Sequence, residues 1–579
     1  MATREQPADL YDVAILGGGL AGLTLALQLR KARPETSVFV AEKRPGPAPE
    51  AAFKVGESTV ELSCNYFGEV VGMKDHLEHD QIHKCGLRFF FPAGDNSDLA
   101  ERVELGPPLY PPVPSYQLDR GRFENEASKR VADAGADLFM GAFVDGVELG
   151  GDHHAVTIVR GGPGGERTTI NARWVVDASG RAFILKRKLG LEQSNGHVVN
   201  SSWFRLAGGL DIEQWVPQDD AQWFERMKQR GWRRFSTNHL CGQGYWVWLI
   251  PLSSGPISIG IVADPRFHPW ERMNTLEASL DWIREFEPQL SEALDGRADD
   301  VEDFLKIEDF SYSCKQVFSS DRWALTGEAG AFLDPFYSPG SDYIAMSNTF
   351  ITDIVTRELD GEEVAKRVDA HNDLYLSAFA THLTFYEDQY VFWGNPAVMG
   401  AKITANNILY WGANALLFFH RKLTELEFMS EVRPDLERIW AVNRRLEELF
   451  RQWHAVDSRE WRRGYVGVTD FPALIQRHIQ LTAGFDDDAL KAQLAANADV
   501  MEAVAVLIFN KAAAALGNGA PGDDVKIDPY KVSLEPDRWE ADGLLGGSGL
   551  TVAEARQGPA GGLESCFADV VAQPALSPR

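Results

Sequence analysis

The sequence predicts an α/β protein in which a doubly wound sheet is combined with a large antiparallel β-sheet and a helical C-terminal region. Three observations lead to this fold class. A strand, a glycine turn and a helix open the chain, aromatic strand-like segments fill its middle, and helical periodicity follows. Because 579 residues are too many for one compact core of ordinary size, we expect at least two cooperating units.

The N-terminal segment has the β-α-β order of a doubly wound, Rossmann-like unit. Residues 11–16 form an apolar run typical of a buried parallel strand, 20–31 have helical periodicity, and 37–42 form a second strand. Acidic residues precede the first strand, which leads directly into the glycine turn. This pattern differs from that of a signal peptide.

Strand patterns continue through the middle of the chain. Alternating apolar residues at 154–160 and 167–176, joined by a glycine-rich loop, predict a hairpin. Between about 198 and 262 the chain carries SSWFRLAGG, GYWVWLIPL and ISIGIVAD, which favour a large antiparallel sheet. Such a sheet is suited to form one wall of a substrate pocket.

These patterns divide the chain into three regions. The first, 8–350, is the doubly wound domain, interleaved with antiparallel-sheet segments of a substrate domain at about 87–120 and 195–310. The second, 351–516, has few Gly or Pro and is expected to be a helical C-terminal domain. The third, 517–579, is rich in Gly, Pro, Ser and Asp, a composition compatible with a mobile tail.

Charge and hydropathy exclude two kinds of partner. The chain has 57 Lys and Arg against 84 Asp and Glu, and its net charge of −27 repels nucleic acids and anionic membranes. The longest later apolar stretch, 408–419, is interrupted by Gly412 and Asn414 and is too short to span a bilayer. We therefore expect a soluble protein with no nucleic-acid partner and no membrane span.

The five cysteines show neither a metal-binding nor a disulfide pattern. They are scattered without CxxC spacing, and the neighbouring His153 and His154 lie at a hairpin-like position that does not indicate a metal site. We expect reduced thiols in a cytoplasmic protein and no bound metal. The cysteines are Cys64, Cys85, Cys241, Cys314 and Cys566.

The glycine turn predicts a dinucleotide site. GGGLAG at 17–22 satisfies G-x-G-x-x-G between a strand and a helix, so the helix N-terminus favours a pyrophosphate. The first glycine permits the tight turn, the second lets phosphate approach the backbone, and the third allows close helix packing. Glu42, twenty residues after the motif, is placed to bind a ribose. The predicted contacts are Gly17, Gly19, Ala21, Gly22 and Glu42.

Three later segments distinguish FAD from NAD. WVVDASGR at 174–181, WALTGEAG at 323–330 and YQLDR at 116–120 resemble, in the expected order, segments of FAD-dependent monooxygenase-type proteins. The resemblance implies an FAD-binding domain. Glu328 stands where that wider group usually has Asp at the ribityl chain. The implied flavin contacts are Arg120, Asp177 and Glu328 in these segments and Asp334, which follows the segment 323–330.

The chain has no second strand-linked G-x-G-x-x-G motif and therefore no obvious nicotinamide domain. A partner flavin reductase is expected to supply the reduced flavin, although some members of the wider group are reduced directly.

One motif is more specific. WVWLIP at 246–251 matches the W-x-W-x-I-P motif of flavin-dependent halogenases. Taken alone, the pattern is a strand with two indoles on one face, which also suits an aromatic core strand. Together with the glycine turn, it makes the chain resemble the flavin-dependent halogenase family, of the tryptophan halogenase-like type, over roughly 8–349. The matched indoles, Trp246 and Trp248, are predicted to line the substrate pocket.

The resemblance implies a mechanism and a catalytic lysine. In that family halide attacks a flavin hydroperoxide, and the hypohalous acid formed travels to a lysine beside the substrate. Lys84 is the fitting lysine because it follows GEST at 56–59 at about the family's distance and opens a strand. Its ammonium can polarise the oxidant or be transiently chlorinated; an ordinary surface lysine is the alternative. Lys54 and Ser58 are expected beside the flavin.

FLDPFYSPG at 332–340 resembles the family's flavin and halide loop. It implies chloride or bromide binding at Ser338, Pro339 and Gly340, with backbone donors from the serine and the glycine. Tryptophan halogenases usually carry Glu directly before the serine, whereas this chain has Tyr337, a predicted substrate-pocket residue. The difference argues against tryptophan as the substrate, although phenol- and pyrrole-type members also lack that Glu.

The leading hypothesis is a halogenase, dependent on reduced FAD and O2, that acts on an electron-rich aromatic or similar small molecule, free or carrier-bound. The alternatives are an FAD-dependent monooxygenase or dehydrogenase without halogenation, and a flavin-binding sensor or scaffold without turnover. A homodimer is left open. Aromatic residues of the helical region are compatible with either the substrate chamber or a core stripe. They are Phe385, Tyr386, Tyr390, Phe392 and Trp393.

Overall fold

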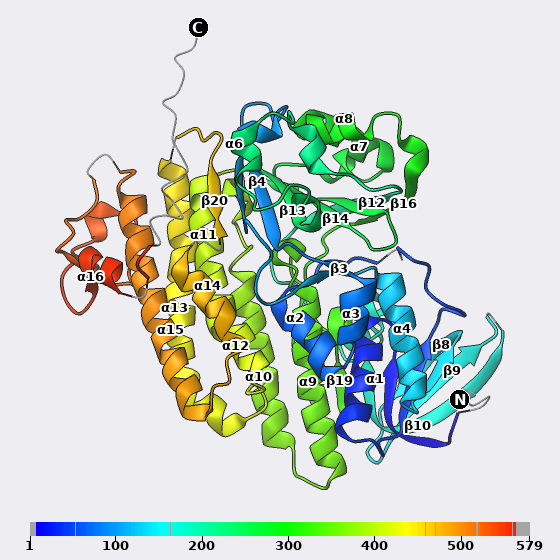
Figure 1. Ribbon diagram of the computed structural model, residues 1–579. Coiled ribbons are helices and arrows are strands. Elements are labelled where there is room, and N and C mark those ends of the chain that lie inside the picture. Colours follow the sequence, from blue (N-terminus) through cyan, green and yellow to red (C-terminus); the bar gives the residue numbers. More distant parts are fainter. Residues whose placement is uncertain are drawn as a thin grey trace.

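The computed structural model describes residues 7–51, 54–162, 164–457, 459–468, 471–516, 519–558 and 560–562. Three regions lie side by side (Figure 1): a mostly parallel sheet with its helices, an antiparallel sheet carrying two short helices on its outer side, and a group of long helices. The predicted fold class is confirmed. The two large sheets and the long helices meet around the segments that carry the sequence motifs.

The first sheet is the doubly wound one. Its path is β18-β19-β10-β1-β2-β7, and the neighbours from β19 to β7 run parallel, while β8 and β9 extend it antiparallel. Helix α1 (Leu20–Ala32) follows β1 and packs against α4 (Arg120–Asp133) and α9 (Gly340–Leu359). The strands are β1 (Leu10–Leu16), β2 (Val38–Glu42), β7 (Asp137–Met140), β8 (Ala142–Glu148), β9 (His154–Arg160), β10 (Glu166–Asp177), β18 (Phe318–Ser319) and β19 (Trp323–Leu325).

The second sheet is mainly antiparallel, as predicted. Its order is β16-β12-β15-β14-β13-β4-β5-β20, with parallel pairs only at β13-β4 and β5-β20 among the described strands. Helices α7 (Leu276–Phe286) and α8 (Pro288–Leu294) cover one face. The strands are β4 (Leu87–Phe91), β5 (Val103–Gly106), β12 (Asn200–Leu206), β13 (Thr237–Gly242), β14 (Tyr245–Pro251), β15 (Ile257–Ala263), β16 (Val301–Ile307) and β20 (Tyr465–Gly467).

The helical region is tied to both sheets. Helix α9 starts inside the predicted first domain, and strand β20 from the predicted helical domain joins the edge of the antiparallel sheet. Two π-helical segments, η1 (Tyr66–Val70) and η11 (Tyr410–Asn414), interrupt helices, a feature frequent at functional sites. The main helices are α10 (Ala365–Leu383), α11 (Pro396–Leu409), α12 (Ala415–Phe419), α13 (Leu426–Val456), α14 (Pro472–Gln480) and α15 (Asp487–Ala513).

Helix α15 is long and apolar enough to cross a membrane by length and composition, but 67% of its most apolar window is buried inside the protein. Its environment is therefore that of a core helix. The strand pair β21 (Lys526–Ile527) and β22 (Leu550–Thr551) and helix α16 (Val552–Gln557) follow it, and α16 packs on α15.

The described part of the C-terminal segment 517–579 contains buried residues. Ile527 and Val552 are fully buried, so the described part of 517–579 belongs to the packed structure. Residues 563–579, with Cys566, lie outside the described residues. The four other cysteines are free and buried, as expected for reduced thiols.

Candidate active site

The glycine turn lies at the carboxyl edge of the parallel sheet, where β1 and β10 end together. Gly17 has a φ of +123°, and a Cβ there would lie 2.4 Å from the carbonyl oxygen of Ala178. A Cβ on Gly22 would lie 2.0 Å from the carbonyl oxygen of Gly17. Side chains at these two positions would fill the space that the turn needs, so both glycines are required by the backbone path.

The start of α1 is prepared for an anion. Gly19 is the N-cap, and the first turn, which contains Ala21, has no acidic residue to neutralise the helix dipole. Glu42 ends β2 and accepts a hydrogen bond from the Gly18 N–H at 2.9 Å. The carboxylate predicted to bind a ribose therefore lies beside the turn.

Two cations are held at the turn by one buried carboxylate. Lys54 Nζ lies 2.8 Å from Glu124 Oε2, and Arg120 Nη2 lies 2.6 Å from Glu124 Oε1. A Cβ on Gly19 would meet Lys54 Nζ at 3.4 Å, so this ammonium stands over the turn. Burial acts to raise the pKa of Glu124, but Arg120 and Lys54 outweigh it and lower the pKa. Both cations lie near the turn, and their predicted position beside the flavin stays a prediction.

A cavity of about 1090 Å³ begins beside the first residue of α1 and extends under the antiparallel sheet; we call it the turn-side cavity. Trp246 and Trp248 of β14 point into it, whereas Val247 and Leu249, which alternate with them along the strand, pack in the core on the other face of the sheet. The two indoles therefore share one face, as predicted. Strand β14 directs them toward the cavity next to the glycine turn, so their assignment to the substrate pocket stays a prediction.

These features fit FAD. The glycine cradle, the dipole of α1 and Lys54 suit a pyrophosphate, and the neighbouring cavity offers broad aromatic walls to a planar ring. His239 also lines the cavity, and burial lowers its pKa to about 3, so its imidazole is neutral. Trp246, Trp248 and residues of the segment 327–344 all line this cavity and would hold the flavin.

The three later carboxylates differ in their placement. Glu328 lines the turn-side cavity and accepts a hydrogen bond from Arg181 Nε at 2.9 Å. Asp177 does not line it, because its two oxygens accept the N–H groups of Ser179 and Leu185 and hold the turn after β10. Asp334 also faces away from this cavity. Its carboxylate accepts hydrogen bonds from Tyr390 Oη (2.5 Å), His197 Nε2 (3.0 Å) and the Phe336 N–H (3.0 Å).

Lys84 lies in the wall between this cavity and a second one. Its Nζ donates to Ser58 Oγ at 3.0 Å and to the carbonyl oxygen of Thr59. Ser58 lines the turn-side cavity, and Ser338 Oγ donates to Ser58 Oγ at 3.0 Å. A single serine side chain therefore links the ammonium of Lys84 to the edge of the predicted halide loop.

The surroundings of Lys84 are not those of a surface lysine. It follows β3 (Ile82–His83) and is only 1% exposed. Burial lowers its pKa to about 8, although Glu61, Cys64 and Asp342 act in the opposite direction. The prediction of an ordinary surface lysine, left open by the sequence, is excluded. An amine with a pKa near 8 can serve both as an ammonium donor and, once deprotonated, as a nucleophile.

The second cavity, about 1180 Å³, lies between Lys84 and the C-terminal helices; we call it the helix-side cavity. Tyr337, Phe385 and Tyr386 line it, whereas Tyr390, Phe392 and Trp393 are buried in the core. Pro339 and Tyr343 line both cavities. Tyr337, one of the three predicted substrate-pocket residues, thus lines the same helix-side cavity as Lys84.

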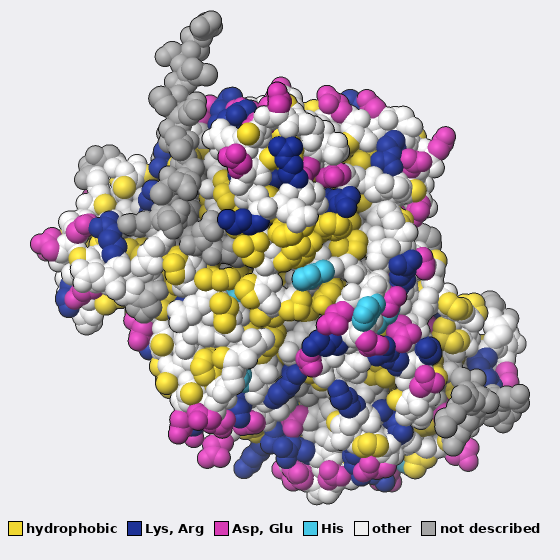
Figure 2. All heavy atoms as spheres, in the orientation of Figure 1, with side chains coloured by type: hydrophobic (Ala, Val, Ile, Leu, Met, Phe, Trp, Pro, Cys, Tyr) yellow, Lys and Arg dark blue, Asp and Glu magenta, His cyan; other side chains and the backbone are white. Residues whose placement is uncertain are grey.

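The wall of this cavity reaches the molecular surface at the loop 107–114. Pro111 lines the cavity and is half-buried, while Leu109 of the same loop is 38% exposed. Figure 2 shows hydrophobic side chains gathered in a band between the antiparallel sheet and the helices below it. An apolar compound approaching this face therefore meets apolar surface.

Sequence analysis missed most of the polar groups in the helix-side cavity. Asp342 Oδ1 accepts the Ser63 N–H at 2.9 Å and its Oδ2 accepts from Tyr410 Oη at 2.8 Å. Burial raises the pKa of Asp342 to about 7. Because these groups come from α2 (Glu61–Asn65), α9, α10, η11 and α14, no local motif joins them. The missed residues are Glu61, Asp342, His382, Tyr410, Trp411, Asn414 and His478.

The predicted halide loop has a strained residue at its centre. Ser338 has a φ of +59°, a left-handed conformation that is unusual without glycine and frequent at functional sites. Its N–H donates to the carbonyl oxygen of Pro335 at 2.8 Å, so this predicted halide donor is already used. Gly340 begins α9, whose first N–H groups have no intrahelical acceptor.

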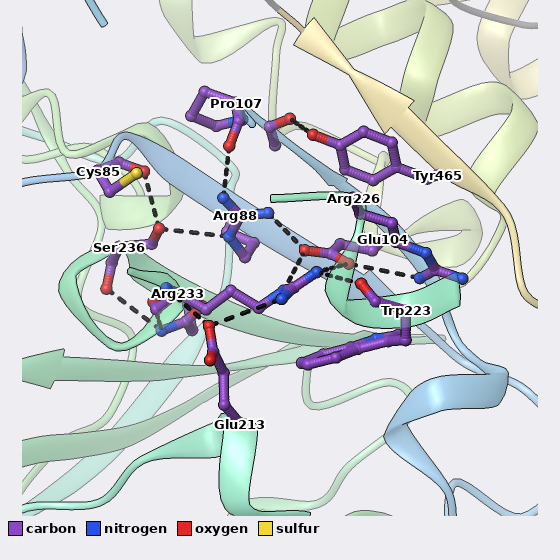
Figure 3. A network of polar contacts seen from close by, with 12 residues as sticks. Cys85, Arg88, Glu104, Pro107, Glu213, Trp223, Arg226, Arg233, Ser236 and Tyr465 are labelled. Carbon is purple, nitrogen blue, oxygen red and sulfur yellow. Dashed lines mark hydrogen bonds and ion pairs between the residues drawn. The ribbon is translucent and has the colours of Figure 1, made fainter. Parts of the chain in front are cut away.

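A second buried polar cluster lies four residues beyond Lys84 (Figure 3). Glu104 Oε1 accepts from Arg88 Nη1 at 2.5 Å and from Arg233 Nε at 2.8 Å, and Arg226 Nη1 lies 3.4 Å from Oε2. Burial alone would raise the pKa of Glu104, but Arg233 and Arg88 outweigh it and hold the pKa at about 2. Arg88 also donates to Ser236 Oγ, and this hydroxyl donates to the carbonyl oxygen of Cys85, the residue after Lys84.

Comparison with known proteins agrees with this geometry. Residues 10–255 match the family model described as an FAD binding domain. Flavin-dependent halogenase chlA of Dictyostelium discoideum is 26% identical over 437 residues, which cover 69% of this chain and 69% of that protein. The 1H-pyrrole-2-carbonyl-[peptidyl-carrier protein] chlorinase of Pseudomonas fluorescens is 27% identical over 348 residues, covering 57% of this chain and 72% of the chlorinase.

Solved structures show the same fold. The crystal structure of halogenase PltM in complex with phloroglucinol and FAD has a TM-score of 0.61 and 18% identity, over 83% of this chain and 99% of that one. The flavin-dependent brominase Bmp2 has a TM-score of 0.52 and 21% identity, over 67% of this chain and 91% of that one.

Proposed function

The chain belongs to the flavin-dependent halogenases, and we propose that it halogenates an electron-rich aromatic compound held in the helix-side cavity, with Lys84 delivering the oxidant. It is an enzyme and its cofactor is FAD. The observation that carries the proposal is the position of Lys84, because its ammonium contacts Ser58 on the turn-side cavity and itself lines the helix-side cavity.

Reduced FAD, bound at the glycine turn, would use O2 to convert chloride or bromide into hypohalous acid. Lys84 then binds the hypohalous oxygen through an N–H and presents the halogen to the substrate ring. Gly340, with the free N–H groups at the start of α9, is the proposed halide contact. The apolar walls keep bulk water away from the oxidant.

Separate cavities argue against direct oxygenation of the substrate. A hydroxylating flavoenzyme needs its substrate beside the flavin ring, where Trp246 and Trp248 occupy the wall of the turn-side cavity. Lys84 and Ser58 stand between that cavity and the helix-side cavity. This separation favours the halogenase over the monooxygenase or dehydrogenase.

We further propose that a separate flavin reductase supplies the reduced FAD and that the enzyme works in the cytoplasm. Among the described residues the cysteines are free and buried, in keeping with a reducing compartment. The pyrrole chlorinase among the relatives is named for a carrier-bound substrate, so a carrier-bound substrate is proposed here beside a free one.

Halide dependence tests the proposal. Purified protein is incubated with FAD, a flavin reductase, NADH, a panel of electron-rich aromatics and either chloride or bromide, and products are identified by mass spectrometry. We expect halogen-containing products that vanish without halide and fall by roughly 10²–10⁴-fold in Lys84→Met, since a positioned proton donor contributes about that much. FAD binding by Lys84→Met, followed by flavin fluorescence, is the control. Oxidised products that do not depend on halide or on Lys84 would show a monooxygenase instead.

A further inference from the structure

The proposed function leaves two buried carboxylates on the wall of the helix-side cavity without a role, Glu61 and Asp342. Glu61 begins α2, and its Oε1 lies 3.2 Å from Nε2 of His478, on helix α14. Its Oε2 accepts a hydrogen bond from Trp411 Nε1 at 3.1 Å. Glu61, His478 and Trp411 all line the same cavity as Lys84.

The contacts define the charge of this group. The Val113 N–H donates to Nδ1 of His478 at 3.4 Å, which leaves the imidazole proton on Nε2, directed at Glu61. Burial works to raise the pKa of Glu61, but the contact with His478, first through its hydrogen bond, and the hydrogen bond from Trp411 act in the opposite direction, so the pKa lies below its ordinary value. Glu61 is therefore a carboxylate anion whose position is fixed from two sides.

This carboxylate has unused hydrogen-bonding capacity. A carboxylate has about four acceptor sites, and Glu61 receives side-chain hydrogen bonds only from His478 and Trp411 among the described residues. Asn406, also on the cavity wall, has a buried Oδ1 with no hydrogen bond in the described part of the chain. Most of the remaining wall is apolar. The cavity therefore selects a flat, apolar ligand that donates hydrogen bonds.

We propose that Glu61 is a catalytic residue that binds the hydroxyl of a phenolic substrate and accepts its proton while a ring carbon faces Lys84. The inference rests on the halogenase function proposed above. It gives this chain a carboxylate in the substrate cavity although Tyr337 replaces the glutamate that tryptophan halogenases carry before the serine. The carboxylate comes from a different element, α2, instead of from the halide loop.

The reaction balances with the named groups. The ring carbon ortho or para to the hydroxyl attacks the halogen of hypohalous acid, forming the carbon–halogen bond and breaking the oxygen–halogen bond. The oxygen leaves with a proton from the Lys84 ammonium as water, and the phenolic proton moves to Glu61. Loss of the ring proton, which returns to Lys84 through water, restores aromaticity as Glu61 gives its proton back to the phenolic oxygen. One hypohalous acid is consumed and one water is formed.

Glu61→Gln tests the assignment because it keeps the shape of the side chain and removes the charge. Resorcinol and 1,3-dimethoxybenzene serve as probes, since both rings are electron-rich but only the first has hydroxyl groups. The enzymatic rate for each probe is divided by the rate at which free hypochlorous acid chlorinates the same probe. This ratio corrects for the different intrinsic reactivity of the two rings. We expect the wild type to prefer resorcinol by tenfold or more, and Glu61→Gln to lose that preference through kcat more than through KM.

A second readout separates proton acceptance from a structural role. With a series of fluorinated phenols of falling pKa, the ratio of wild-type to Glu61→Gln rates should shrink, because an acidic phenol needs the base less. Glu61→Asp keeps the negative charge, so its rates should depend on the pKa of the phenol as those of the wild type do. This variant also keeps the proposal testable if Glu61→Gln does not fold. A ratio that is constant across the series would overturn the proposal.

Asp342→Asn is the matched control. Asp342 lines the same cavity, but its carboxylate is held by the Ser63 N–H and by Tyr410 Oη, so the same chemical change should keep the preference for resorcinol. If Asp342→Asn lost that preference and Glu61→Gln kept it, the proton acceptor would be Asp342, and the inference would be overturned.

Trapping of the oxidant distinguishes the two proposals. Taurine added without an aromatic substrate is converted by hypochlorous acid to its chloramine. If the wild type and Glu61→Gln both form it at similar rates, Glu61 acts after the oxidant is made, as proposed. Chloramine from the wild type without halogenation of resorcinol overturns the role of Glu61, whereas no chloramine from the wild type overturns the halogenase function itself.

Discussion

Two buried charged groups lie four residues apart and differ in what surrounds them. Lys84 touches Ser58 and a carbonyl oxygen, forms no ion pair among the described residues, and lines a cavity. Arg88 is bound to Glu104 at 2.5 Å and to the carbonyl oxygen of Pro107 at 2.6 Å, in a cluster that also contains Arg233 (Figure 3). Both side chains are almost completely buried.

The comparison teaches that burial of a charge does not by itself indicate a functional site. In the Glu104 cluster the arginines are paired with Glu104 and Glu213 inside the protein, so the charges oppose one another and the groups hold β4 and β5 in place. At Lys84 and Glu61, capacity remains and faces a cavity. Unused capacity beside an apolar chamber is the feature that indicates chemistry.

The largest expected effect is a difference in the free energy of unfolding between variants of Arg88 and of Lys84. Arg88→Met removes one of the three arginines that contact Glu104 and leaves the carbonyl oxygen of Pro107 without its donor, so the free energy of unfolding should fall by about 1–3 kcal/mol. Lys84→Met removes an unpaired buried cation and should not lower it. Urea unfolding followed by tryptophan fluorescence measures both. Equal losses in the two variants would contradict the distinction.

The next effect concerns pH. Because burial lowers the pKa of Lys84 to about 8, halogenation should fall about tenfold per unit as pH rises well above 8 and the ammonium donor is lost. Glu61, Asp342 and Cys64 are the charged or titratable groups that act on Lys84. Rates measured from pH 6 to 10 with saturating reduced FAD test this. A rate that rises through pH 8 would instead favour a neutral, transiently chlorinated amine.

The Glu104 cluster should not respond over the same range. The pKa of Glu104 is about 2, below its unfolded value, so its contribution to stability is present above about pH 4.3 and is lost only as pH falls toward 2. The difference in unfolding free energy between wild type and Arg88→Met should therefore stay constant from pH 6 to 8. A change within that range would show that this cluster titrates with the site.

The smallest effect sharpens the electrostatic link inside the cavity. Asp342 acts to raise the pKa of Lys84, so Asp342→Asn should move the alkaline limb of the rate profile to lower pH by a few tenths of a unit. Asp281→Asn, at an exposed position of α7, changes a carboxylate that does not line this cavity and serves as the control for charge removal. A limb that does not move would mean that Asp342 is neutral throughout.

The sequence by itself determined the parts that depend on local geometry. The turn at Gly17 and Gly22 and the paired indoles of 246 and 248 on one strand face follow from spacing within a few residues. These local rules also predicted both sheets and the helical region. Lys84, 25 residues after Thr59, was predicted instead from the resemblance to halogenases.

Only the tertiary structure decided which cavity each group faces. Trp246 and Trp248 line the turn-side cavity, and Asp334 turns away to bind Tyr390 and His197, because strand and loop directions are set by packing between distant elements. The same holds for Glu61 and His478, which are 417 residues apart. Spacing in the sequence cannot encode such a contact, since it forms only when α14 closes the helix-side cavity over α2.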